Sequence, residues 1–309
     1  MPIGEIFALT AAASWAVGSL LFARIGARAA PGAMNLGKCV AAAVVLSLVR
    51  AALSPSLGPI AWTGEAAMLL AASGLVGLTI GDTAYFGAIV ALGVPRAILL
   101  LSAAPVFATL GGVALFGEAL GGREAIGIGL TLAGIALVVS GRRAEAAKSP
   151  ALAVALEPAG RASARRGLML GIVAALCQAG GSLLSRRAMK LGIDPLGAAA
   201  GRLVTAAIGL ALLSSIWGKA RPWIGDLRRE YTWIKVAGAS LIGTVGGIWL
   251  SQLALARCSS TGVATTLLAT SPIFALPLSH AVGHERITAR GAAGTLVALA
   301  GVVILSLRA

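Results

Sequence analysis

SWAVGSLL at residues 14–21 recurs, with substitutions, as CQAGGSLL at residues 177–184. Further segments repeat in the same order in both halves of the chain. Residues 31–38 match 195–202, Pro105-Val106-Phe107 matches Pro272-Ile273-Phe274, and the segment from Glu118 to Gly134 matches that from Glu285 to Gly301. This shared order predicts an internal duplication, with repeats at residues 3–141 and 166–308.

The composition indicates a membrane protein. Hydrophobic residues make up 58% of the chain and charged residues 12%. A soluble protein of 309 residues could not cover so many apolar runs with a polar shell, and run length argues against the alternating strands of an outer-membrane barrel. We therefore predict an all-α integral membrane protein with ten transmembrane helices of ~20 residues each. The runs are 6–23, 32–49, 66–81, 97–117, 125–141, 167–185, 196–218, 236–256, 262–283 and 291–307.

The number of spans per repeat predicts how the two halves are related. Five spans begin and end on opposite sides of the membrane, so the second five-helix repeat must be inverted relative to the first, which is typical of transporters. Residues 142–165 lie between the repeats and are basic, and Pro150 and Pro158 oppose a continuous helix there. We expect this segment to be a flexible connector.

The formal net charge of +14 comes from loops, which argues against nucleic-acid binding and favours contact with anionic lipid headgroups. Outside the spans, loops after odd-numbered spans carry 16 Lys and Arg, against 7 for the other loops and the C-terminus. The positive-inside rule then predicts termini outside the cytoplasm. The three cysteines lack metal-ligand spacing, and the first span lacks a basic preceding segment, so we expect it to be retained.

Glycine and proline mark special positions within the spans. Gly77 and Gly81 in the third span match Gly243 and Gly247 in the eighth, and glycine at i and i+4 lets another helix approach closely. This pattern predicts a tight helix crossing in each half. Proline inside a span removes a backbone hydrogen bond, and we expect helix kinks at Pro105 and Pro272.

These features resemble the drug/metabolite transporter superfamily, in particular its two-repeat EamA-type members. The resemblance rests on Ser14-Trp15, on a basic residue early in spans two and seven, on residues 81–86 (GDTAYF), and on a proline followed by Gly117-Glu118 or His284-Glu285. It implies a ten-helix exporter or exchanger of small metabolites with a central cavity between inverted halves. It also implies cytoplasmic termini, against the charge rule, and it specifies no substrate.

Three charges fall inside spans. Lys38 and Arg202 each lie seven residues after a proline that starts a span, about 10 Å deeper at ~1.5 Å per residue. Either they snorkel back to the interface or they face a polar cavity, because intramembrane charges are usually functional. Asp82 lies late in the third span and is expected either to pair with Lys38, in a pair that exchanges a proton, or to cap local structure. Arg202 would then be left for a substrate carboxylate.

Other residues have weaker assignments. Trp15, Tyr85, Trp249 and Gln252 are predicted to line the cavity, where an aromatic face could bind a ring or a cation. Glu118 and Glu285 are predicted to anchor helix ends near Arg123 and Arg286. His280 and His284 share a helix face, but without a third ligand we predict no metal site.

The sequence is best explained as a multi-pass transporter in a cell membrane of the bacterial inner-membrane type. We expect it to export an amino acid or a similar zwitterion by alternating access, with a coupling proton or a counter-substrate and no bound cofactor. An anionic or lipid-linked substrate is the alternative within transport, and a membrane scaffold without transport is the alternative outside it. No motif of an enzyme is apparent. The sequence does not specify the substrate, the coupling ion, the direction of transport or the oligomeric state.

Overall fold

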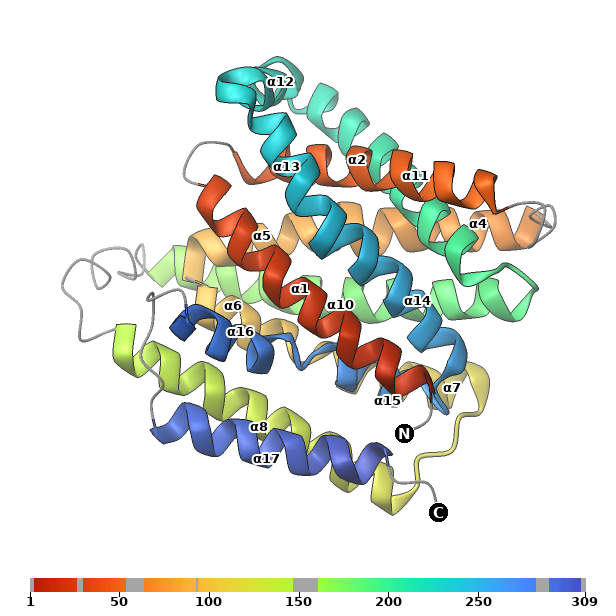
Figure 1. The fold of residues 1–309 in the computed structure, drawn as a ribbon, viewed down its shortest axis with the longest axis vertical. Helices are drawn as coiled ribbons and strands as arrows, with labels where there is room; N and C mark the ends of the chain where they lie inside the picture. Colours follow the sequence, from red (N-terminus) through yellow and green to blue (C-terminus); the bar gives the residue numbers. More distant parts are fainter. Residues whose placement is uncertain are drawn as a thin grey trace.

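The protein is described by a computed structural model that covers residues 3–26, 30–53, 64–92, 94–146, 161–281 and 289–306. These residues form helices and turns, and no β-strand is found among them. Figure 1 shows the helices as one bundle in which segments from both halves of the chain alternate.

The first half of the chain begins with two long helices and continues with shorter, interrupted ones. Its elements are α1 (Ile3–Gly26), α2 (Pro31–Ala52), α4 (Gly64–Ser73), η1 (Gly74–Gly81), α5 (Asp82–Leu92), α6 (Val94–Leu101), α7 (Ala104–Phe116) and α8 (Gly122–Ala146). The second half follows the same plan. Its elements are α10 (Arg161–Lys190), α11 (Pro195–Ile216), α12 (Ala220–Arg228), η2 (Arg229–Tyr231), α13 (Thr232–Ser240), η3 (Leu241–Gly246), α14 (Gly247–Arg257), α15 (Thr261–Leu268), α16 (Ser271–Ala281) and α17 (Ala289–Ser306).

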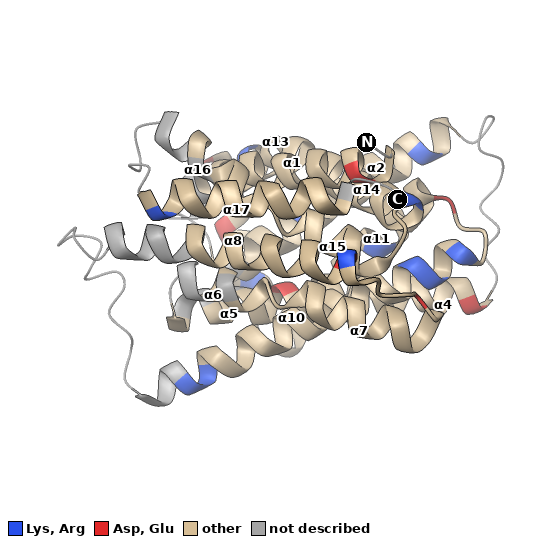
Figure 2. Cartoon of the chain, turned by 90° about the horizontal axis from the view of Figure 1, so that it is seen from below, with Lys and Arg blue, Asp and Glu red and all other residues tan. Residues whose placement is uncertain are grey.

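Six helical segments are long and apolar enough to cross a membrane, by length and composition within the described residues. They are Ile3–Phe22, Gly32–Ala52, Gly64–Tyr85, Arg165–Lys190, Pro195–Ile216 and Ala220–Arg257, and three shorter apolar helices accompany them. Figure 2 shows most charged residues near the ends of the helices. Large apolar side chains such as Leu48, Met68 and Leu212 are exposed on the sides of the bundle, as expected of a surface that faces lipid tails.

The helices of the two halves pack in a crossed pattern. The first helix of each half contacts the third span of the other: α1 lies against α13, η3 and α14, and α10 lies against α4, η1 and α5. The second spans α2 and α11 pack together, as do the fifth spans α8 and α17. Each half therefore completes the packing of the other.

The closest approaches occur at glycines in these crossed contacts. A Cβ added to Gly243 would lie 2.6 Å from the Cα of Gly18, and a Cβ added to Gly181 would lie 2.9 Å from the Cα of Gly77. Side chains larger than hydrogen cannot fit at such contacts. The expected tight crossings thus exist, but the prediction of one crossing within each half is wrong: both join one half to the other. Gly81 and Gly247 lie beside Cys177 and Trp15, respectively, in the same two crossings.

Both third spans contain a π-helical segment at these glycines, η1 and η3. A π-helix widens the backbone and displaces carbonyls from their usual partners. In η1, the Asn35 amide nitrogen lies 3.4 Å from the Leu78 carbonyl. The Thr79 hydroxyl donates to the Ala206 carbonyl at 3.2 Å, and the Ser73 hydroxyl donates to the Gly181 carbonyl. Hydrogen bonds from α2 and to both helices of the second half therefore support η1.

Pro105 and Pro272 do not bend continuous helices. Each lies in the first turn of a new helix, α7 or α16, after a short turn that ends α6 or α15. The turns match in detail: Ala103 donates to Leu100 and Thr270 donates to Leu267 through the backbone. Proline suits a first turn because its missing N–H would have no partner there. The proline inside α16 is Pro277, which the sequence analysis did not identify.

The segment between the repeats is partly helical. α8 extends to Ala146 and α10 begins at Arg161, so both ends of the expected connector belong to helices. Pro150 and Pro158 lie outside the described residues.

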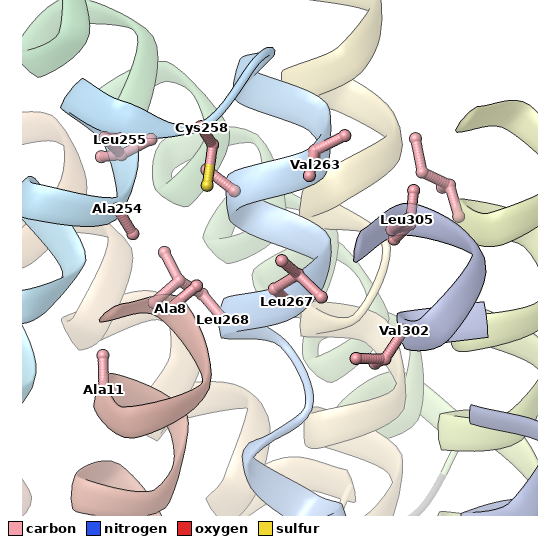
Figure 3. Close-up of a cluster of buried hydrophobic side chains, with 12 residues drawn as sticks. Ala8, Ala11, Ala254, Leu255, Cys258, Val263, Leu267, Leu268, Val302 and Leu305 are labelled. Carbon is pink, nitrogen blue, oxygen red and sulfur yellow. The ribbon is translucent and has the colours of Figure 1, made fainter. Parts of the chain in front are cut away.

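A core of small and branched side chains joins both halves near the two termini. Ala8 and Ala11 of α1 pack there with residues of α14, α15 and α17 (Figure 3). The alanines let α1 approach these helices closely, while Leu267 and Val302 fill the space between them. The N- and C-termini lie near one another at this end (Figure 1).

Candidate functional site

An ion pair lies inside the bundle between the second and third spans of the first half. The Lys38 ammonium of α2 lies 2.9 Å from the Asp82 carboxylate at the start of α5, and the two side chains are 17% and 23% exposed. The antiparallel direction of the two spans brings these residues to one level, so the expected contact between Lys38 and Asp82 is confirmed. Its role in transport stays a prediction.

Arg202 of α11 lies close to this pair and is 4% exposed. Its Nη2 atom packs beside η1, where a Cβ added to Gly77 would lie 3.1 Å away. Only a glycine therefore leaves this much room for the guanidinium. Asp82 acts electrostatically on Arg202, but among the described residues Arg202 has no ion pair, and its Nε has no hydrogen-bond partner.

The charge balance of this cluster determines what it can bind. Lys38 and Asp82 neutralise one another, which leaves the positive charge of Arg202 uncompensated nearby. A buried, unpaired charge is costly unless it finds a partner. A guanidinium offers two parallel N–H groups to a carboxylate or phosphate. The cluster, which we call the Arg202 site (Lys38, Asp82 and Arg202), is therefore suited to a ligand with one anionic group.

The predicted aromatic residues lie in two places. Tyr85 follows Asp82 by one turn of α5, and the charge of Asp82 acts on its hydroxyl. Trp249 packs against a core cluster that includes Cys39 and Leu203, the residues next to Lys38 and Arg202 in sequence. Trp15 lies instead against Gly247 in the crossing of α1 with α14. Tyr85 and Trp249 are therefore nearer to the Arg202 site than Trp15 is.

Gln252 of α14 is fully buried and belongs to a second polar cluster. Its Oε1 accepts a hydrogen bond from the Ser185 hydroxyl of α10. Its Nε2 and the Thr266 hydroxyl of α15 have no hydrogen-bond partner among the described residues. The three residues each lie five positions from a helix end at the same side of the bundle. Two buried polar atoms there are available to a water or to a polar group of a ligand.

The sequence analysis missed a buried ion pair next to this cluster. The Arg186 Nε of α10 lies 3.1 Å from Glu118 Oε1, and both side chains are 9% exposed. Glu118 also accepts hydrogen bonds from the backbone N–H and the hydroxyl of Thr261, each at 2.8 Å. Arg186 donates to the carbonyls of Leu255, Cys258 and Ser259.

This network corrects the prediction for Glu118. We expected an interfacial charge near Arg123, whereas Glu118 is buried, pairs with Arg186 and caps the N-terminus of α15. A carboxylate at this position also interacts favourably with the helix dipole. The equivalent Glu285 and its neighbour His284 lie outside the described residues, as does the side chain of His280. In the described part of the chain, no three His, Cys, Asp or Glu side chains form a potential metal site.

Apolar membrane-spanning helices that enclose buried charges, some of them unpaired, define a polytopic membrane protein with a polar interior. A sequence profile of the EamA-like transporter family matches residues 2–140 and again residues 165–307. The chain therefore belongs to the EamA-like transporter family, a family of membrane transporters of small molecules that contains two copies of the repeat here.

The structural comparison agrees at the level of the fold. A solved crystal structure of a protein with 18% sequence identity superposes with a TM-score of 0.76, covering 98% of this chain and 96% of the other. At this identity the likeness concerns the fold alone. No curated protein sequence shows a significant match to the chain.

Proposed function

We propose that this protein is a secondary transporter that exports a small organic metabolite by alternating access. In this proposal ten transmembrane helices form two inverted five-helix halves. The substrate binds between them at the Arg202 site, and the protein resides in a cell membrane of the bacterial inner-membrane type. The observation that carries the proposal is the guanidinium of Arg202, which is buried and has no anionic partner within the described residues.

The packing of the two halves supports the alternating-access part. Matching helices exchange partners between the halves, and the turns before Pro105 and Pro272 have the same backbone hydrogen bonds. Two similar halves joined in this way can form two related arrangements, each with the site open to one side. The nearly matched glycine contacts at Gly18 and Gly77 provide close crossings about which the halves can move.

The charge of the site supports a carboxylate as the recognised group. An amino acid is the first candidate, because its carboxylate suits Arg202 and its amine can bind Asp82 if Lys38 releases that carboxylate. Exchange of a proton within the Lys38–Asp82 pair would couple transport to the proton gradient. A purely anionic metabolite is the second candidate, since it needs only Arg202. A lipid-linked anion would satisfy the same charge.

The test is extracellular metabolite profiling of cells that overproduce the protein. The comparison includes Arg202→Gln, which removes the charge, Arg202→Lys, which keeps the charge but loses the paired N–H groups, and a Lys38→Ala/Arg202→Ala variant. Arg187→Gln is the matched control, because Arg187 lies on the neighbouring first helix but is half exposed. Membrane insertion and a monodisperse profile in detergent are confirmed for each variant.

We expect one class of carboxylate-containing compound to accumulate outside cells with the intact protein and with Arg187→Gln. Arg202→Gln should abolish this accumulation and Arg202→Lys should reduce it. The presence or absence of an amine on that compound separates the two candidates. No enrichment by the intact protein, or equal enrichment by all variants, would contradict the proposal and favour uptake or a scaffold role.

A further inference from the structure

A groove of about 520 Å³ runs along the outside of the bundle where α1 crosses α13 and η3. Leu21 and Ile25 of α1 form one wall, and Lys235, Gly238, Ala239 and Ile242 belong to the other. Nothing lies within 4 Å of the position that a Cβ on Gly238 would occupy. The groove is therefore open to the surroundings of the protein, and all but one of these residues are apolar.

The neighbouring residues place one end of the groove at the membrane–water boundary. Tyr231 and Trp233 are exposed just before Lys235, and exposed aromatic rings of this kind gather at the level of lipid headgroups. Ile242 lies about 10 Å deeper, seven residues along the helix at ~1.5 Å each. The charged end of the groove thus lies at headgroup depth and its apolar end lies among the acyl chains.

The groove is a feature of one half. The corresponding helices of the other crossing, α10 and α4, pack along more of their lengths. Ala66, Leu70 and Ala188 form a closed core there, with residues from the start of α11. The space beside α1 is therefore not a general result of the repeat architecture.

The charge at the mouth of the groove is positive. Lys235 is exposed, and among the described residues it has no ion-pair partner. Lys219, Arg221, Arg228 and Arg229 lie in the same short segment of the chain. Of the acidic residues there, Asp226 is engaged by the backbone N–H of Ala30 at 2.9 Å. A basic pocket between membrane helices is the arrangement that binds anionic lipid headgroups.

We propose that this groove binds one anionic phospholipid. The phosphate is held by Lys235, and an acyl chain lies against Leu21, Ile25 and Ile242. A phospholipid satisfies both ends of the groove, because it joins a negative group at headgroup depth to an apolar chain that leads into the membrane. A soluble anion would leave the apolar walls uncovered, and a neutral lipid would leave Lys235 without a partner.

The experiment is native mass spectrometry of the full chain, titrated with dioleoylphosphatidylglycerol or dioleoylphosphatidylcholine. For the intact protein we expect one phosphatidylglycerol molecule to bind more tightly than phosphatidylcholine. Lys235→Ala should weaken phosphatidylglycerol binding about fivefold, as expected for one cation near a headgroup, and leave phosphatidylcholine binding unchanged. Lys219→Ala, which removes a cation outside the groove, should have a smaller effect.

Gly238→Leu tests the apolar part, because a leucine there fills the groove without meeting another atom at its Cβ. It should weaken binding of both lipids. Gly129→Leu is the matched control, since Gly129 of α8 also has open space around it. Equal binding by the intact protein and Gly238→Leu would overturn the proposal, as would an equal loss of both lipids in Lys235→Ala. Binding of glycerol phosphate alone with the same affinity would show an anion site without a lipid groove.

Discussion

Breaking the Arg186–Glu118 ion pair should destabilise the fold far more than breaking the ion pair of the next arginine. Glu118→Gln keeps the size of the side chain and an oxygen that can accept from Thr261, but it removes the negative charge 3.1 Å from Arg186. Loss of one partner from a buried pair costs about 3–5 kcal/mol. Arg186 keeps its three carbonyl acceptors, so we expect about 3 kcal/mol.

The matched control is Glu65→Gln. Glu65 lies 3.6 Å from Arg187, and both side chains are at least half exposed, at 58% and 50%. Exposed pairs contribute about 0–1 kcal/mol. Reversible unfolding in mixed micelles, with increasing sodium dodecyl sulfate, measures both free energies. The reasoning is refuted if the two variants differ by less than about 1 kcal/mol, the upper value for an exposed pair. A second replacement, Arg186→Met in the Glu118→Gln background, should recover part of the loss, because no buried charge is then left unpaired.

Gly243→Ala should destabilise the protein by about 1–3 kcal/mol, because its Cβ would lie 2.6 Å from the Cα of Gly18, whereas Gly129→Ala has open space around it and should be neutral or stabilising. Equal stability of these two variants in the same unfolding assay would show that the crossing can widen freely. Asp82→Asn should make transport independent of an imposed pH gradient, because the amide can no longer exchange a proton with Lys38. Transport assays in vesicles at matched and unmatched pH measure this, and an unchanged response to the gradient would exclude Asp82 from proton coupling.

Sequence reasoning identified the Lys38–Asp82 contact because depth and direction suffice for that inference. Lys38 lies a fixed number of residues after the proline that starts α2, and the next span returns towards the same side. The partner of Arg202 follows the same logic: no acidic residue stands in the second half at the position equivalent to Asp82. Both inferences depend only on distances along helices.

The contacts that sequence reasoning missed depend on helix rotation and on the choice of neighbour. Arg186 and Arg187 are adjacent in sequence, yet one is buried and the other is half exposed, which only the packing of α10 determines. Similarly, the spacing of Gly77 and Gly81 identifies a helix face but not the helix that covers it. The breaks before Pro105 and Pro272 depend on backbone hydrogen bonds that a proline alone does not specify.

The crossed packing of the halves limits the order in which the newly made chain can fold. Gly77 reaches its contact only when Gly181 has been synthesised, and Gly18 has to wait for Gly243. Contacts between residues this distant in sequence form late, since the intervening chain must first be closed into a loop. The first five-helix segment therefore leaves the ribosome with its glycine faces and the Lys38–Asp82 pair uncovered. Its stability in the membrane during synthesis depends on lipid or on an insertion partner until the second half arrives.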